Sequence, residues 1–161
     1  MPYLLTVKTA IPLPIARVFA FFADAANLDR LTPPWLHFRI ETPLPISMGP
    51  GALLDYRLRL HGIPIRWRTE VTEWNPPHGF VDEQRRGPYR WWIHTHTFTE
   101  SADGVDMEDV VDYQPRGGAI VHACFVGRDL RRIFTWRAAA LRDALGLPPD
   151  RSRPGIVIAR R

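Results

Sequence analysis

Apolar and polar residues alternate through most of residues 38–113, and this period of two predicts a series of β-strands. The clearest alternation lies on both sides of His61-Gly62, a pair of residues that is typical of a tight turn. If these two residues form the turn of a hairpin, Tyr56 faces Trp67 across the two strands. Turn residues recur at regular intervals farther along the region, so we expect a continuous antiparallel meander.

Helical spacing replaces this alternation on either side of the meander. Apolar residues at positions 15, 18, 19 and 22 predict a helix, which a second short helix over residues 28–31 follows. Residues 118–146 predict a long C-terminal helix with one apolar stripe, ended by a glycine. With a first strand at residues 3–9, this order predicts an α+β fold in which a curved antiparallel sheet of about seven strands wraps around the long helix. Such a sheet leaves a ligand cavity where it bends away from the helix.

The composition is typical of one compact domain. At 161 residues and 45% hydrophobic content, the chain supports a single core, which we assign to residues 1–147. Cys124 is the only cysteine, so the sequence has neither an internal disulfide nor a four-thiolate zinc site. No stretch approaches the roughly 20 apolar residues of a membrane span, and the N-terminal residues lack the layout of a signal peptide. We therefore expect a cytoplasmic protein without a membrane span.

The net charge of +4 comes mostly from residues 148–161, where arginines 151, 153, 160 and 161 outnumber a single acid. We expect these residues to form a flexible, solvated tail. The remainder is close to neutral, which argues against a nucleic-acid partner. The outer face of the predicted hairpin carries a basic stripe of Arg57, Arg59, Arg66 and Arg68, for which solvation is the ordinary explanation. A regulatory or protein-interaction module that uses the stripe and the tail is the alternative.

The segment RWWIHTHTFTE, residues 90–100, carries two histidines on one predicted strand. Side chains two residues apart share a face, so His94 and His96 lie on the same face as Trp92 and Phe98. We expect this face to line the cavity, because the following strand has apolar residues at the facing positions. In the register set by a turn at residues 101–104, the facing pairs are Phe98 with Met107, His94 with Val111 and His96 with Asp109.

Three roles are open to His94, His96 and Asp109. In the simplest, the histidines form hydrogen bonds in the cavity and shape a binding site. Alternatively, the three residues are catalytic acid–base groups in the cyclisation or dehydration of a carbonyl substrate, because imidazole titrates near the operating pH and a carboxylate fixes its tautomer. Two histidines and a carboxylate also match a metal triad. No longer-range motif supports that triad, so we expect no metal and no cofactor.

Residues on the same inner faces complete the predicted ligand-binding site. These are Tyr56, Leu58, Trp67, Thr69, Gln84, Phe98, Val111, Phe134 and Ala138. The sequence leaves open which face of the strand at residues 80–86 points into the cavity. Asp82 and Gln84 point inward if Phe80 does, and Glu83 points inward in the opposite case.

Three segments carry a resemblance to a known superfamily: IPLPIARVFAFFADAANLDRLTPPW, DEQRRGPYRWWIHTHTF and GRDLRRIFTWR. Together with the order of elements, they make residues 3–146 similar to the START/Bet v 1-like (SRPBCC) superfamily and, within it, to bacterial polyketide cyclase/dehydrase-like proteins. The resemblance implies a helix-grip fold with a mostly apolar cavity. It leaves the reaction open, because the superfamily includes lipid carriers, hormone receptors and aromatic cyclases. We therefore expect a small hydrophobic or aromatic molecule as the partner, with a cyclase/dehydratase as the alternative and with the oligomeric state open.

Overall fold

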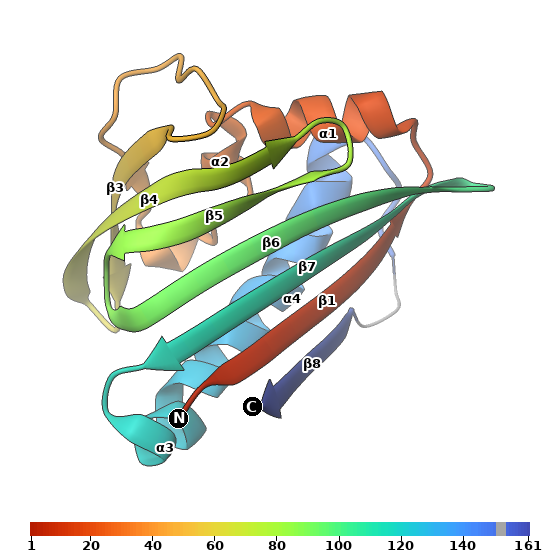
Figure 1. Cartoon of the computed structure of the whole chain (residues 1–161). Helices are drawn as coiled ribbons and strands as arrows, with labels where there is room; N and C mark the ends of the chain where they lie inside the picture. The colour runs from red at the N-terminus through yellow and green to blue at the C-terminus, as the bar shows by residue number, and fades with distance from the viewer. Residues whose placement is uncertain (151–153) are drawn as a thin grey trace.

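The described part of the chain folds into one eight-stranded antiparallel sheet with helices on one side of it (Figure 1). The computed structural model describes residues 1–150 and 154–161. In chain order the elements are β1 (Tyr3–Ile11), α1 (Ile15–Ala23), α2 (Asn27–Arg30), the 3₁₀ turn η1 (Pro34–Leu36), β2 (Arg39–Ile40), β3 (Leu53–Leu60), β4 (Ile63–Asn75), β5 (Gly79–Arg86), β6 (Tyr89–Ser101), β7 (Gly104–Pro115), α3 (Gly118–Val121), the π turn η2 (His122–Val126), α4 (Gly127–Ala144) and β8 (Gly155–Arg160). The strands lie in the order β2-β3-β4-β5-β6-β7-β1-β8. The predicted helix-grip fold is confirmed.

The turn between β3 and β4 is the one predicted from the sequence. His61 and Gly62 both have positive φ angles, of 51° and 81°, as in the two-residue turns whose twist matches that of the flanking strands. Tyr56 pairs with Trp67 across the hairpin, and their rings stack with centroids 5.9 Å apart. The turn therefore brings two large aromatic side chains together on the inner face of the sheet.

The outer face of this hairpin is polar, and two of its arginines have acidic partners. Arg68 lies opposite Asp55 and donates a hydrogen bond of 2.7 Å from Nε to Oδ1. Arg57 pairs with Glu41, which follows β2. These pairs neutralise part of the basic stripe.

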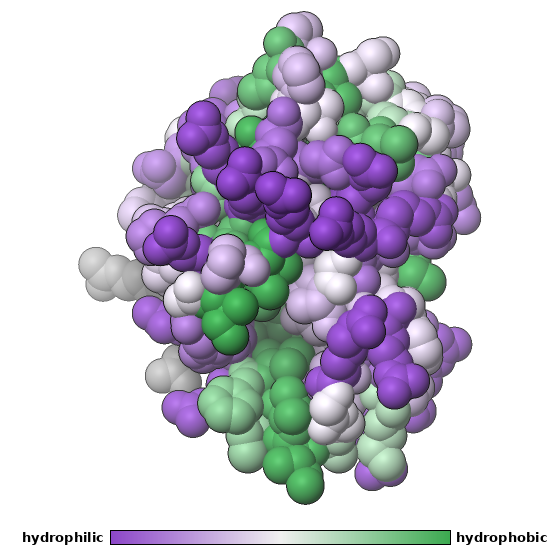
Figure 2. All heavy atoms as spheres, turned by 90° about the vertical axis from the view of Figure 1, so that its left-hand side faces the viewer, coloured by the Kyte–Doolittle hydropathy of each residue, from purple (hydrophilic) through white to green (hydrophobic). Residues whose placement is uncertain are grey.

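One side of the molecule changes in polarity from its upper to its lower half. Figure 2 shows hydrophilic residues over most of the upper half and hydrophobic residues at the bottom, at the level where Figure 1 places α3. Two large apolar side chains of this region are exposed, Ile120 at 79% and Phe125 at 55%. The apolar surface of α3 and η2 is therefore only partly covered by the sheet.

The long C-terminal helix is confirmed, with a π turn inside it. α3, η2 and α4 follow one another without a break from Gly118 to Ala144, and Gly146, with a φ of 72°, comes directly after the helix has ended. Leu130 and Phe134 are buried on the side of α4 that packs on the sheet. Within the part of the chain that the structure describes, no helix is long and apolar enough to cross a membrane.

The C-terminal residues contain a strand where we expected a flexible tail. β8 pairs with β1 from Tyr3–Arg160 to Lys8–Gly155, and Ile156 and Ile158 pack against the cluster of buried residues around β1 and α4. The two alternating isoleucines share the face that meets this cluster, while the backbone of β8 covers the edge of β1. The predicted flexible residues 151–153 lie outside the described part of the chain.

Candidate functional site

A cavity of about 200 Å³ lies between the inner face of the sheet and the helices. Residues from β3, β4, β5 and β6 line one side, and residues from α1, α2 and α4 line the other. Three clusters of buried apolar residues border it, represented by Phe22, Trp67 and Leu54. The cavity therefore occupies the place where the packing of these clusters leaves a gap.

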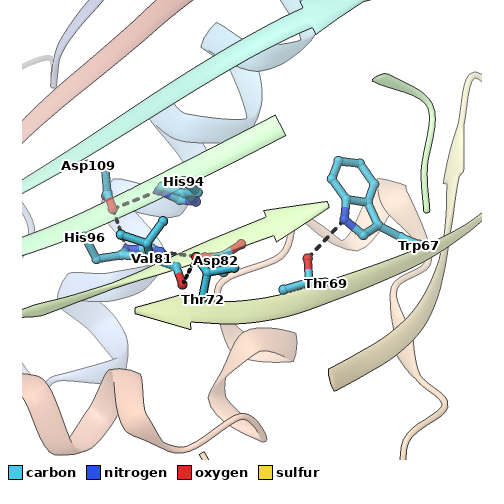
Figure 3. Close-up of polar contacts among 8 residues, drawn as sticks. All are labelled: Trp67, Thr69, Thr72, Val81, Asp82, His94, His96 and Asp109. Carbon is cyan, nitrogen blue, oxygen red and sulfur yellow. Dashed lines mark hydrogen bonds and ion pairs between the residues drawn. The ribbon is translucent and has the colours of Figure 1, made fainter. Parts of the chain in front are cut away.

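Most of the predicted cavity residues lie on its wall. The structure brings together Tyr56, Leu58, Trp67, Thr69, His94, His96 and Phe134. The Nε1 atom of Trp67 donates a hydrogen bond of 3.2 Å to Thr69 Oγ1 (Figure 3). This bond satisfies the indole N–H and leaves the aromatic ring as an apolar surface for a ligand.

The other predicted residues lie away from the cavity wall. Phe98 is 1% exposed and packs against α1 in the core, with its ring centroid 5.2 Å from that of Phe22. Val111 is fully buried under the sheet face, and Ala138 on α4 is not among the lining residues. The side-chain amide of Gln84 instead bonds the backbone of Tyr89, where β5 turns into β6.

The sequence did not identify several of the residues that line the cavity. Among them are Tyr89, Phe80 and Arg137. Arg137 follows Phe134 by three positions on α4, so the helical period was the signal that could have identified it. Tyr89 stands at the start of β6, and its ring packs against Trp92, with the centroids 4.8 Å apart.

The two histidines of β6 point inward and meet a buried carboxylate. His94 and His96 are 7% and 4% exposed, and His96 lies directly opposite Asp109 of β7, as predicted. Nε2 of His94 lies 3.1 Å from Asp109 Oδ1. Nδ1 of His96 lies 2.7 Å from the same oxygen, but at an angle that does not make a hydrogen bond, so the contact is chiefly electrostatic.

Asp82 of β5 completes the group from the other side. Its Oδ2 atom lies 3.1 Å from Nε2 of His96, and Figure 3 shows the two imidazole rings between Asp82 and Asp109. Phe80 is 7% exposed and stacks on His96 with centroids 4.2 Å apart. The inward direction of Phe80 and Asp82 resolves the face of this strand, which the sequence left open.

The two imidazoles have opposite tendencies to carry a proton. Burial, with a further contribution from the charge of His96, lowers the pKa of His94. Burial also opposes a charge on His96, but the carboxylates of Asp109 and Asp82 outweigh it and raise the pKa of His96. Burial likewise opposes the charge on Asp109, yet its contacts with His94 and His96 hold its pKa well below the usual range. Of the two imidazoles, His96 therefore holds a proton more readily than His94 does.

A metal-compatible set of side chains is present, with a different carboxylate from the one predicted. Among the described residues, possible ligand atoms of Asp82, His94 and His96 all lie within 4.8 Å of one another. All three residues line the cavity, whereas Asp109 lies behind the histidines. The sequence pattern identified both histidines but placed Asp109 in the role that the geometry gives to Asp82.

Comparison with known proteins places the chain in a family. Residues 11–142 match the family described as "Polyketide cyclase / dehydrase and lipid transport". No curated protein matches the sequence significantly.

Solved structures share the fold at low sequence identity. Protein CV1439 from Chromobacterium violaceum is 16% identical, with a TM-score of 0.70 over 91% of this chain and 99% of the other. Protein Ms6760 from Mycobacterium smegmatis is 18% identical, with a TM-score of 0.66 over 89% and 90% of the two chains. Ara h 8.0201 is 13% identical, with a TM-score of 0.64 over 90% and 98%. These similarities establish a common architecture and leave the ligand open.

Proposed function

We propose that this chain, which belongs to the polyketide cyclase/dehydrase and lipid transport family, binds a small hydrophobic or aromatic molecule in the cavity. The fold of this family is a ligand-binding scaffold. The observation that carries this proposal is the wall itself, where the rings of Tyr56, Trp67 and Trp92 lie close together. Aromatic walls with a few polar groups are typical of small-molecule sites. The polar groups on this wall, His94 and His96, give such a ligand a fixed orientation.

The size of the cavity limits the ligand. An apolar cavity of about 150 Å³ binds benzene, so the volume of about 200 Å³ suits a molecule with one ring or two fused rings. A bicyclic phenol such as 2-naphthol combines an apolar body with one hydroxyl for the histidines. We use it as a probe and not as the natural ligand.

Titration of the protein with 2-naphthol tests the binding proposal. We expect saturable quenching of tryptophan fluorescence, because Trp67 and Trp92 line the cavity. Ile133→Phe, which adds volume to the α4 side of the wall, should weaken binding by at least tenfold. Thr135→Phe adds a ring at an exposed position of the same helix and should leave binding unchanged. Equal binding by both variants and the wild type would place the probe outside the cavity and contradict the proposal.

A second candidate function follows from the histidine pair. Its lowered pKa suits His94 to accept a proton, and its raised pKa suits His96 to donate one; both residues line the cavity. Two neighbouring groups whose environments move their pKa values apart suit general acid–base chemistry. The matching reaction class is removal of a proton next to a carbonyl group, with Asp109 orienting His94, as in a cyclase or dehydratase of a carbonyl substrate.

Deuterium exchange tests this chemistry without knowledge of the natural substrate. 1-Tetralone, a bicyclic ketone, is incubated with the protein in D₂O, and NMR follows the loss of the protons next to its carbonyl group. We expect exchange above the buffer rate, its loss in His94→Gln, and its retention in His78→Gln, which changes an exposed histidine. Tetralone that binds but exchanges only at the buffer rate would exclude the catalytic role and leave the binding role intact.

A further inference from the structure

We propose that the chain binds a divalent transition-metal ion on the cavity wall through Asp82, His94 and His96. Their possible ligand atoms lie within 4.8 Å of one another, and Nε2 of His96 is 3.1 Å from Asp82 Oδ2. Ligand atoms of one ion with bonds of about 2.1 Å stand roughly 3 Å or slightly more apart. The trio therefore needs only small side-chain movements to close around an ion.

Asp109 supplies the outer support that such a site requires. Metal-bound histidines commonly donate their second ring N–H to a carboxylate, which fixes the ring and its tautomer. Here one oxygen of Asp109 faces Nε2 of His94 at 3.1 Å and Nδ1 of His96 at 2.7 Å. Within the described chain, Nδ1 of His94 has no hydrogen-bond partner, and Nε2 of His96 is directed to Asp82. One nitrogen of each ring is thus left for the ion.

The charge of the group favours a cation. Asp82 and Asp109 are largely buried, with side-chain exposures of 18% and 7%, and both contact the histidines. Buried charges are costly unless they are paired. Arg137, the arginine of the cavity wall, has its guanidinium group over the ring of Phe134, 6.0 Å from the ring centroid. An ion of charge +2 beside two neutral histidines makes the group neutral.

The ligand types select the class of ion. Imidazole nitrogens suit zinc, iron, cobalt, nickel and copper, whereas magnesium and calcium prefer all-oxygen sites. Three protein ligands leave at least one coordination position, and because the trio lines the cavity, that position faces the space where a ligand would lie. A ligand with a carbonyl or hydroxyl oxygen could then reach the ion.

Metal titration of the full chain tests the site. Protein freed of metal with a chelator is titrated with Co²⁺ alone and with Zn²⁺ alone, followed by visible absorption and calorimetry. We expect one equivalent of either ion per chain, and in the Co²⁺ form paramagnetic shifts of the ring protons of His94 and His96. The NMR measurement uses the wild-type protein, so it does not depend on whether a variant folds.

Variants separate this site from adventitious binding. Asp82→Asn should weaken Co²⁺ binding by at least tenfold, and Asp109→Asn by about 10- to 100-fold through the support of the histidines. Glu83→Gln, which changes the neighbouring carboxylate paired with Arg85, should leave the affinity unchanged. Absence of one-to-one binding, or equal affinity in Asp82→Asn and the wild type, would overturn the metal site. Binding of 2-naphthol by the chelated protein would persist in that case, so the failure of this inference differs from failure of the proposed function.

Discussion

Asp109 is the residue on which the polar part of the cavity wall depends. It is 5% exposed and contacts both histidines. A carboxylate at this depth is costly unless it is paired, and the nitrogen atoms of His94 and His96 supply its partners. Removal of the charge of Asp109 leaves Asp82 as the remaining acidic partner of His96.

We expect Asp109→Asn to lower the free energy of unfolding by about 3 kcal/mol in the metal-free protein at pH 7, because it breaks a buried ionic group while keeping its volume. Urea denaturation in the presence of a chelator measures the change. Asp106→Asn, at an exposed position on the same strand, should change stability by less than about 0.5 kcal/mol. If Asp109→Asn changed the free energy of unfolding by as little as Asp106→Asn, the ionic contacts would contribute little to stability.

His122 makes the fold sensitive to acid at a place far from the histidine pair of β6. Nε2 of His122 lies 2.8 Å from the Tyr113 hydroxyl, and its ring stacks on Tyr3 with centroids 3.5 Å apart. Burial lowers the pKa of His122. Folding therefore favours the neutral form of this ring.

A histidine whose pKa is lowered by folding stabilises the protein above its unfolded pKa of about 6.5, and this contribution is lost as the pH falls through the folded pKa. As the pH falls below about 6.5, stability should therefore decrease more steeply in the wild type than in His122→Gln, which cannot take up a proton. Urea denaturation at several pH values measures the difference. Parallel profiles of the two proteins would remove His122 from the acid response.

The positions of single site residues could be predicted where the local strand and turn geometry determines them. Strand alternation identified the inward direction of His94 and His96, and the length of the turn after β6 placed Asp109 opposite His96. Asp82 was harder to predict, because β4 and β5 pair with irregular register and the sequence leaves open which face turns inward. Asp82 pairs with His94 in the regular ladder of β5 and β6, and its side chain contacts the neighbouring His96.

At the scale of elements, β8 is the strand that the sequence pattern did not predict. Its six residues, Gly155–Arg160, form a strand because the edge of β1 is available for pairing. Nothing adjacent in the sequence signals that partner, whereas the hairpin at His61 carries its register in its own turn. The double proline at 148–149 and the arginines favoured a solvated tail.

The contribution of β8 can be measured on its two faces. Ile158 packs against the buried cluster, so Ile158→Ala should lower the free energy of unfolding by about 1 kcal/mol. Val157, on the opposite face, is 59% exposed, and Val157→Ala should have an effect within about 0.5 kcal/mol. Thermal or urea unfolding of both variants gives the comparison. Equal effects would mean that β8 is not packed through its isoleucines.

At the scale of the whole molecule, the cavity follows from the meeting of three apolar clusters and not from any one element. Phe22 of α1, Leu54 of β3 and Phe134 of α4 each belong to a different cluster, and all three line it. Sequence patterns predicted that sheet and helix enclose a space. They did not define its wall, because Phe98 and Val111 pack within the core while Tyr89 and Arg137 line the cavity.

Because several elements share the cavity, a ligand should stabilise the folded chain as one unit. At 100 times its dissociation constant, 2-naphthol should raise the free energy of unfolding by about 2.7 kcal/mol, which for a chain of this size corresponds to an increase in Tm of roughly 5–10 °C. Calorimetry at rising probe concentrations measures the shift. In Ile133→Phe the same concentrations should produce almost no increase, since the added ring fills the space that the probe needs. An equal shift in this variant would mean that the probe stabilises the protein from another surface.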